Sequence, residues 1–450
     1  MIPIWLGIVG VLAALGVLLG AVRWYQARFA PPPEIPRKLV HVSMGLIVLS
    51  FPWVFAERWP VVLLGALATG ALLAVRYVRG LRRSVGTVLH SVERESLGEL
   101  AFPAAVAFVF WLANGNAVAY IVPVLMLTLA DATAAVIGIR YGVVRFATAD
   151  EPKSLEGSVA FFIVAFLSAL VPLLLMTDMG RAEVLLIATI LGLLIAMIEA
   201  VSWRGLDNLF IPVGTYVFLV VHRPLPWQQL LVRLGVLGLL VVAALLWRRR
   251  TTLGHRAAVQ AALVCYLFWV LGGAAWVLAP AALFFTYALV PPLTDDERAL
   301  PHDSRIVASN VVVGLFWVFA SVLTRRPEFL YVFSVAFAAH LSENSVNRML
   351  RRYPTWLTGT QIAVSTLKAI AFILLPWAAL SGLPLAQLLP LLSAGVVTSA
   401  IAGGAAQWLE ALRGPDPQDV PRGWMQAGVA FAMSLASLAV LVAVIPGVRP

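Results

Sequence analysis

Long apolar runs are the feature that most constrains this chain of 450 residues. Most runs are about 17–25 residues long, which is the helix length that crosses the roughly 30 Å of hydrocarbon in a bilayer. The runs are continuous and lack the alternation of apolar and polar residues that barrel strands show. Because backbone polar groups must be satisfied inside lipid, these segments should be helices. The sequence therefore predicts an all-α, polytopic integral membrane protein.

The composition agrees with this fold class. Hydrophobic residues make up 61% of the chain and charged residues 12%, and the mean hydropathy is +0.92. Roughly 14–16 transmembrane helices are expected, because three of the sixteen predicted segments (100–113, 209–221 and 281–293) are short. The first run has no cleavage-like site after it and should be a retained span. The remaining predicted spans are 2–22, 39–56, 59–78, 117–139, 158–177, 183–201, 229–247, 257–279, 306–324, 329–345, 361–380, 385–402 and 425–446.

The basic residues are distributed unevenly along a chain of formal net charge +10. With the N-terminus outside the cytoplasm, 24 of the 32 Lys and Arg residues fall in cytoplasmic loops and five in the opposite loops. This asymmetry predicts the orientation, with a bacterial inner membrane as the expected location. Topology and anionic lipid also explain the basic clusters, so nucleic acid is not an expected partner. The single cysteine, Cys265, excludes an intrachain disulfide.

The loops divide the chain into two parts. Those before about residue 222 are rich in mixed charge, and those after about 250 are sparser. The Pro-rich stretch HRPLPWQ at 222–228 should interrupt the helical pattern. We therefore expect membrane domains at 1–222 and 251–450, joined by a connecting span and linker at 223–250. No strict internal repeat is evident.

Charged and small residues gather in the first half at the predicted cytoplasmic ends of spans. Arg37, His41 and Gly45 share one helix face, with Lys38 beside them. An acid inside a span, such as Asp131, costs roughly 2.5–3.5 kcal/mol on insertion scales and is generally functional. The segments that carry these residues are PRKLVHVSMG (36–45), SVERESLGELAFP (91–103), DATAAVIGIRYG (131–142), KSLEGS (153–158), Glu199, and Asp207 with Asn208.

Each segment also has a plainer interpretation. Small residues on membrane helices usually allow close helix packing. Lys153 could be a topological charge, and His41 a packing residue. Asp207 and Asn208 could form an N-cap. Asp131 and Glu199 could be structural ion pairs.

Taken together, the acids and bases point to phosphate chemistry. Carboxylates bind Mg²⁺ through oxygen while the ion keeps water and phosphate ligands. Lys and Arg offset the charge of the phosphates and the charge that develops during transfer. The start of the span after Lys153 offers free N–H groups to an anion. No G-x-x-x-x-G-K-[ST] motif occurs, which excludes a P-loop.

In this order, RKLVHVSMG, SVERESLGEL, DATAAVIGIRYG, KSLEGS and the acid before GLDNLFIP resemble the phytol kinase and dolichol kinase family over about residues 35–222. The resemblance implies phosphate transfer to an isoprenoid alcohol such as phytol or geranylgeraniol. It also implies Mg²⁺, a cytoplasm-facing site, and a donor that is typically CTP, with UTP and ATP left open. Homo-oligomerisation is left open too.

The resemblance also implies roles for particular residues. Those expected to take part in the transfer are Asp131, Lys153 and His41, where either Asp131 or His41 could accept the proton of the hydroxyl. Those expected at the nucleotide are Arg37, Lys38, Gly138, Arg140, Gly142, Ser154, Gly157 and Asn208. Those expected at the metal are Asp131, Glu156, Glu199 and Asp207.

The second half loosely resembles the membrane family that includes phytyl-phosphate kinase, through TLGHRAAVQ (252–260), AAHLSE (338–343) and TGTQIAVST (358–366). A second phosphorylation would follow from that resemblance. His340 stands where an Asp-containing block is expected, and acids at 295–297 stand where a Lys is expected. Two alternatives stay open: a site built from Glu343, Asn344 and Asn347, or an inactive scaffold.

Two rival functions fit the same composition. A cytidylyltransferase would form a CDP-lipid, but the Lys-Asp and His-Gly-Gly signature of that family is missing. A secondary transporter would also have many spans and buried charges. The clustering of acids at one predicted surface favours the kinase.

Overall fold

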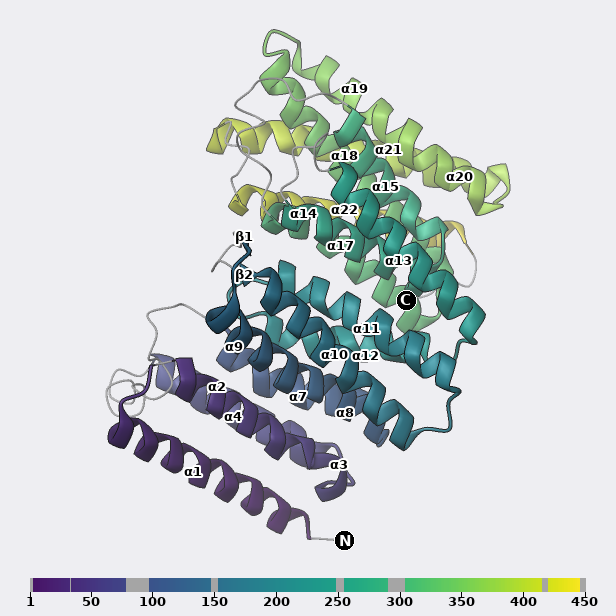
Figure 1. The fold of residues 1–450 in the computed structure, drawn as a ribbon. Helices are drawn as coiled ribbons and strands as arrows, with labels where there is room; N and C mark the ends of the chain where they lie inside the picture. Colours follow the sequence, from purple (N-terminus) through teal and green to yellow (C-terminus); the bar gives the residue numbers. More distant parts are fainter. Residues whose placement is uncertain are drawn as a thin grey trace. The chain divides into compact units, whose positions relative to one another are not determined.

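A computed structural model describes residues 3–32, 34–77, 97–146, 153–247, 255–289, 304–414 and 420–445 (Figure 1). It is helical apart from one antiparallel pair of two-residue strands, β1 (Arg145–Phe146) and β2 (Lys153–Ser154). Within these ranges, eight helices are long and apolar enough to cross a membrane, and six further apolar helices are shorter. The prediction of an all-α polytopic membrane protein is confirmed.

The chain forms two compact units, unit 1 (Met1–Val236) and unit 2 (Leu237–Pro450). The division falls within α13 (Trp227–Trp247), inside the segment 223–250. The preceding helix ends at His222, so the predicted break at 222–228 is confirmed.

Unit 1 is a bundle whose helices run from α1 to α12. In order, its elements are α1 (Ile4–Phe29), α2 (Glu34–Leu49), α3 (Phe51–Val54), α4 (Trp59–Tyr77), α7 (Gly98–Ala113), α8 (Ala117–Leu125), the π-helical turn η1 (Met126–Ala130), α9 (Asp131–Tyr141), α10 (Leu155–Met176), α11 (Arg181–Val201) and α12 (Asp207–His222). The expected span at 39–56 is wrong as a single helix. It breaks after Leu49, and the short α3 that follows has Pro52 in its first turn.

Neighbouring helices of unit 1 pack in a closed series. α10 packs against α9 and α11, α11 against α12, and α12 against α7 and α8 (Figure 1). α8, η1 and α9 form one continuous helix, which brings Asp131 into this series. The packing places the end of α9 against the start of α10.

Unit 2 is built around α18 (Leu330–Arg352), which contacts α15, α17, α19, α21 and α22. Most of its residues are buried, including polar ones in its C-terminal half. The other elements of the unit are α14 (His255–Gly272), α15 (Ala275–Leu289), α17 (Ser304–Thr324), the 3₁₀ turn η3 (Pro327–Phe329), α19 (Thr358–Ala369), the π turn η4 (Ile370–Leu374), α20 (Leu375–Ser381), α21 (Leu385–Arg413) and α22 (Val420–Val444).

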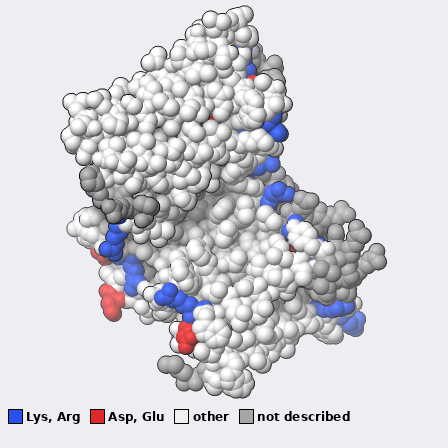
Figure 2. Space-filling view, turned by 180° about the vertical axis from the view of Figure 1, so that it is seen from behind, with Lys and Arg blue, Asp and Glu red and all other residues white. Residues whose placement is uncertain are grey.

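The surface agrees with lipid exposure. Large apolar side chains such as Val17, Leu175 and Leu323 are 74–80% exposed. Figure 2 shows uncharged residues over most of the visible face, with charged side chains in a few groups near its margins. An exposed apolar surface of this extent is expected where lipid, rather than water, surrounds the protein.

Candidate functional site

The first part of the candidate site is an ion pair between α2 and α9. Lys38 Nζ donates to Asp131 Oδ2 at 2.7 Å, and the two side chains are 15% and 16% exposed. Arg37, on the exposed side of α2, also interacts electrostatically with Asp131. The predicted grouping of Arg37, Lys38 and Asp131 is therefore present.

A π turn positions Asp131. Such turns widen the helix by one residue and often occur at functional sites. The Leu127 carbonyl within η1 lies 3.0 Å from His41 Nε2. Because a carbonyl can only accept, His41 Nε2 carries a proton and donates it. This nitrogen also lies 3.7 Å from Asp131 Oδ2.

Two further contacts hold α2 in place, the first against α7 and the second against this turn. The rings of His41 and Phe102 meet edge to face at 5.3 Å between centroids. A Cβ added to Gly45 would overlap the Thr128 side chain, so only glycine allows this approach. Sequence reasoning missed Phe102 and the Leu127 carbonyl, since neither a lone aromatic residue nor a π turn has a clear local signature.

The second part of the site is an ion pair between the strand before α10 and the end of α11. Lys153 Nζ lies 2.5 Å from Glu199 Oε1 and 2.7 Å from the Glu199 carbonyl oxygen. Pairing of Phe146 with Lys153 in the small sheet orients the strand that carries this lysine. The Glu199 residue is 8% exposed. Lys153 is therefore an ion-pair partner and not only a topological charge.

Asp207 joins the two ion pairs into one cluster. It begins α12 and interacts electrostatically with Asp131, Lys153 and Lys38. It also interacts with Glu199. We call these five residues the charge cluster: three carboxylates and two ammonium groups contributed by α2, α9, β2, α11 and α12.

Asn208 has a separate structural contact. Its Nδ2 donates to the Gly98 carbonyl at 2.9 Å and ties α12 to the start of α7. Leu206 occupies the N-cap position of α12, without a side-chain cap. The alternative that Asp207 and Asn208 form the N-cap is therefore wrong.

The predicted glycines lie where α9 crosses α10. A Cβ on Gly157 would come 3.0 Å from the Ala134 carbonyl, and one on Gly138 would come 3.1 Å from Ser154 Oγ. A Cβ on Gly142 would also collide with Ser154. The contacts of these glycines are with the neighbouring helix, as for close helix packing. Their predicted role at a nucleotide stays a prediction.

Three other predicted residues lie near the junction of α9 and α10. Ser154 caps α10, and its Oγ accepts from Gly157 N at 3.1 Å. Glu156 Oε1 accepts from Val144 N at 3.2 Å, which joins the first turn of α10 to the loop after α9. Arg140 is exposed, and its guanidinium lies 5.5 Å from the Tyr141 ring centroid.

The described residues do not form a ready-made metal cage. Within them, no three His, Cys, Asp or Glu side chains are grouped so that they could hold a metal ion. Of the four predicted carboxylates, Asp131 and Glu199 face lysines and Glu156 faces the Val144 amide, and the role of the four at a metal stays a prediction. One or two carboxylates suffice for Mg²⁺ when substrate phosphates supply further ligands. Asp131 and Asp207, whose charges interact, are candidates for that second arrangement.

Some predicted residues lie outside the described part of the chain. They are Glu93, Arg94 and Glu95 of the acidic stretch and the acids at 295–297. Glu99 is described and lies in the first turn of α7.

One curated relative supports the resemblance seen in the motifs. A phytol kinase of Synechocystis sp. is 26% identical over 216 residues, which are 48% of this chain and 90% of that protein. No protein-family model matches the chain, and no solved structure matches it significantly. The resemblance to the phytol and polyprenol kinases is confirmed over about half of the chain.

Proposed function

We propose that unit 1 is a membrane kinase that phosphorylates a long-chain isoprenoid alcohol such as phytol or geranylgeraniol. The terminal phosphate of a nucleoside triphosphate passes to the alcohol hydroxyl and yields a prenyl monophosphate and a nucleoside diphosphate. CTP is the donor we expect, with UTP and ATP as alternatives. The charge cluster is the observation that carries this proposal, and the similarity to a phytol kinase supports it.

The charge cluster matches what a triphosphate needs. Lys38 and Lys153 each form an ion pair with a carboxylate. These pairs compensate the positive charges in an environment from which water is largely excluded. Phosphate oxygens can replace those carboxylates as partners of the ammonium groups. Asp131 and Asp207 would then hold Mg²⁺, which offsets phosphate charge when bound. The lysines would stabilise the negative charge that develops on the transferred group.

The geometry separates the roles of His41 and Asp131. His41 Nε2 already donates to the Leu127 carbonyl, so this nitrogen cannot accept a proton from the alcohol. We assign His41 to positioning of the π turn and Asp131 to acceptance of the hydroxyl proton. Phosphoryl transfer depends mainly on positioning and electrostatics, so modest proton transfer is sufficient.

The membrane supplies the second substrate. The isoprenoid tail would stay in lipid beside the short helices α7 and α12, while the hydroxyl reaches the charge cluster at the cytoplasmic surface. The nucleotide would enter from the cytoplasm. In a bacterium this corresponds to the inner membrane.

The second phosphorylation stays a prediction for unit 2. Glu343 is 1% exposed and contacts His340 Nδ1 at 3.1 Å. Among the described residues, Asn344 and Asn347 line a pocket and Glu343 does not. A carboxylate enclosed in this way has no evident route to a phosphate, so we limit the proposed kinase activity to unit 1.

The test uses the full chain, purified in lipid nanodiscs. CTP, UTP or ATP labelled on the γ-phosphate is supplied with phytol, geranylgeraniol or no alcohol. We expect labelled prenyl monophosphate that depends on Mg²⁺. Pyrophosphate release with formation of a CDP-lipid would instead identify a cytidylyltransferase. Solute uptake by proteoliposomes without nucleotide turnover would identify a transporter.

A further inference from the structure

Several helix contacts of unit 2 follow the same chain order as contacts of unit 1. In unit 1, α7 packs on α8 and α12, α9 on α10, α10 on α11, and α11 on α12. In unit 2, α17 packs on α18 and α22, α18 on α19, α19 on α21, and α21 on α22. In this comparison α18 takes the place of the continuous α8–α9 helix, whereas the extensive contact of α18 with α21 has no comparable counterpart between that helix and α11.

The sequences of the paired helices agree with this correspondence. LADATAAVIGIRYG (129–142) aligns with LSENSVNRMLRRYP (341–354), which pairs Asp131 with Glu343. Each segment ends in an Arg-Tyr pair, and each of these arginines lies 5.5 Å from the adjacent ring. Similarly, IEA (198–200) aligns with LEA (409–411) and pairs Glu199 with Glu410. These short matches pair acids of the two units, and no strict repeat is evident from the sequence.

The basic partners of the aligned acids Glu199 and Glu410 differ between the two units. In unit 1, Lys153 from the strand before α10 pairs with Glu199. In unit 2, Arg422 from the first turn of α22 pairs with Glu410 and also donates to the Gly414 carbonyl. Asp207 lies in the first turn of α12, whereas an arginine lies in the first turn of α22. Among the described residues, this end of unit 2 therefore has an arginine where unit 1 has an acid.

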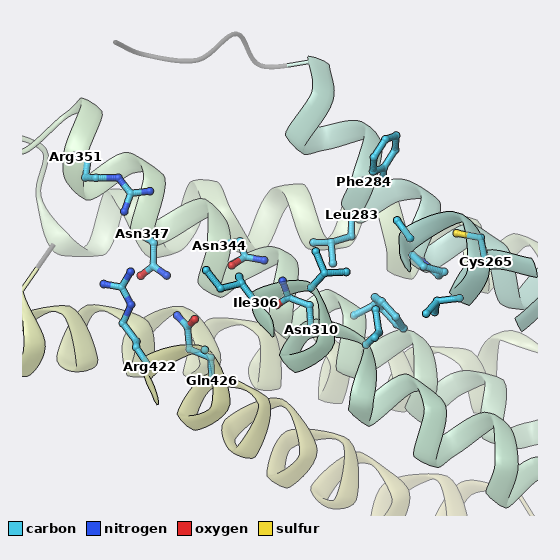
Figure 3. Close-up of a pocket in the computed structure, with 17 residues that line it drawn as sticks. Cys265, Leu283, Phe284, Ile306, Asn310, Asn344, Asn347, Arg351, Arg422 and Gln426 are labelled. Carbon is cyan, nitrogen blue, oxygen red and sulfur yellow. The ribbon is translucent and has the colours of Figure 1, made fainter. Parts of the chain in front are cut away.

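Unit 2 contains a cavity of about 120 Å³ at this place, lined by α14, α15, α17, α18 and α22. Its two ends differ (Figure 3). Arg351, Asn347, Arg422 and Gln426 gather at one end, and the apolar end includes Cys265. Among the described residues, no Asp or Glu lines it. The cavity therefore combines a positive, polar end with an apolar end.

Two buried amide atoms at the polar end have no hydrogen-bond partner among the described residues. They are Asn347 Oδ1 and Gln426 Nε2, in side chains from residues that are each 6% exposed. A buried amide group without a partner costs free energy, so such a group calls for a ligand or water. Gln426 Nε2 can donate to an anion, and the Asn347 amide can donate or accept according to its orientation.

We propose that this cavity binds the phosphate-bearing head group of an amphipathic lipid. Gln426, Asn347 and the guanidinium of Arg351 would contact the phosphate oxygens, because arginine suits the geometry of phosphate. Arg422 would add positive charge while it keeps its pair with Glu410. The cavity has room for a head group and the first carbons of a chain, which the apolar end around Cys265 would receive.

Two sources supply this chemistry: the prenyl monophosphate that unit 1 is proposed to make, and a phosphate lipid of the membrane. The proposal goes beyond the kinase reaction and does not require it. Binding is therefore measured without nucleotide, so that failure of the kinase activity and failure of this proposal are distinguishable.

Cys265 is the only cysteine in the chain and lines the cavity, so it reports occupancy in the unmodified protein. Detergent-purified full-length protein is treated with N-ethylmaleimide in the presence of farnesyl monophosphate, farnesol, phosphatidic acid or inorganic phosphate. We expect farnesyl monophosphate or phosphatidic acid to protect Cys265 at concentrations at least about tenfold below that of farnesol. Protection by the first alone identifies an isoprenoid ligand, and protection by the second alone identifies a membrane lipid. Equal protection by farnesol, or no protection by either phosphate lipid, overturns the proposal.

A matched pair of variants gives a second measurement by native mass spectrometry. Arg351→Gln removes a charge that lines the cavity. Arg352→Gln removes an exposed charge from the next residue of α18. We expect the first variant to weaken binding of the protecting lipid at least about tenfold and the second less than about twofold. Equal affinities of the two variants overturn the proposal, whether or not Cys265 reacts.

Discussion

The Lys38–Asp131 ion pair offers the most informative perturbation of unit 1. In Asp131→Asn the amide oxygen can still accept from Lys38 Nζ, which now lies 2.7 Å from Asp131 Oδ2, but the charge is lost. Removing one partner of a fully buried ion pair costs about 3–5 kcal/mol. The pair is 15–16% exposed and Asn keeps an acceptor, so we expect a loss of about 2 kcal/mol in the free energy of unfolding.

Activity should fall much further than stability. If Asp131 binds the metal-nucleotide, its loss should lower the rate of phosphate transfer about 100- to 1,000-fold. The exchange of Lys38→Asp with Asp131→Lys separates a structural role from a catalytic one. We expect this double variant to regain at least half of the lost stability while it stays inactive, because the charges are restored but their positions are reversed.

Thermal unfolding and γ-phosphate transfer are measured on the same preparations. These are the wild type, Asp131→Asn, the single variants Lys38→Asp and Asp131→Lys, and the exchanged pair. Arg352→Gln, a substitution at an exposed position of unit 2, serves as the control for purification and assay conditions. Full activity of Asp131→Asn, or recovery of activity in the exchanged pair, would refute the assignment of Asp131 to the site.

Three further predictions concern the same unit. Lys153→Ala should lower the transfer rate at least about 100-fold, as measured with labelled CTP, because it removes the ammonium group beside Glu199; unchanged activity would leave Lys153 with a structural role only. Gly45→Ala should destabilise the protein by about 1–3 kcal/mol, because its Cβ overlaps Thr128, whereas Gly70→Ala, with nothing within 4 Å, should be neutral or slightly stabilising in the same unfolding assay. Chelation with EDTA should abolish transfer and Mg²⁺ should restore it while the unfolding temperature stays unchanged, since no resident metal cage is present among the described residues; a large loss of stability on chelation would contradict this view of the metal.

The sequence could predict which residues belong to the candidate site better than which of them form ion pairs with one another. Asp131 and Glu199 were identifiable because acids are rare in apolar runs. Lys38 and Asp131 are 93 residues apart, and Lys153 and Glu199 are 46 apart. Their partnership depends on which helices pack together, and no local pattern encodes that. The same holds for Gly138 and Gly157, whose contacts with the neighbouring helix are not evident from sequence and whose predicted role at a nucleotide stays a prediction.

The sequence by itself determined that the chain is a helical membrane protein, where most of its helices lie, and which charged residues are unusual. These properties follow from hydrophobicity, helix period and turn residues, which act over a few neighbouring positions. Only the tertiary structure decided the two lysine–carboxylate pairs, the π turn before Asp131, the packing of unit 2 around α18 and its two-ended cavity. Each of these results from the approach of distant helices, where close packing and the partners of buried polar groups are settled together.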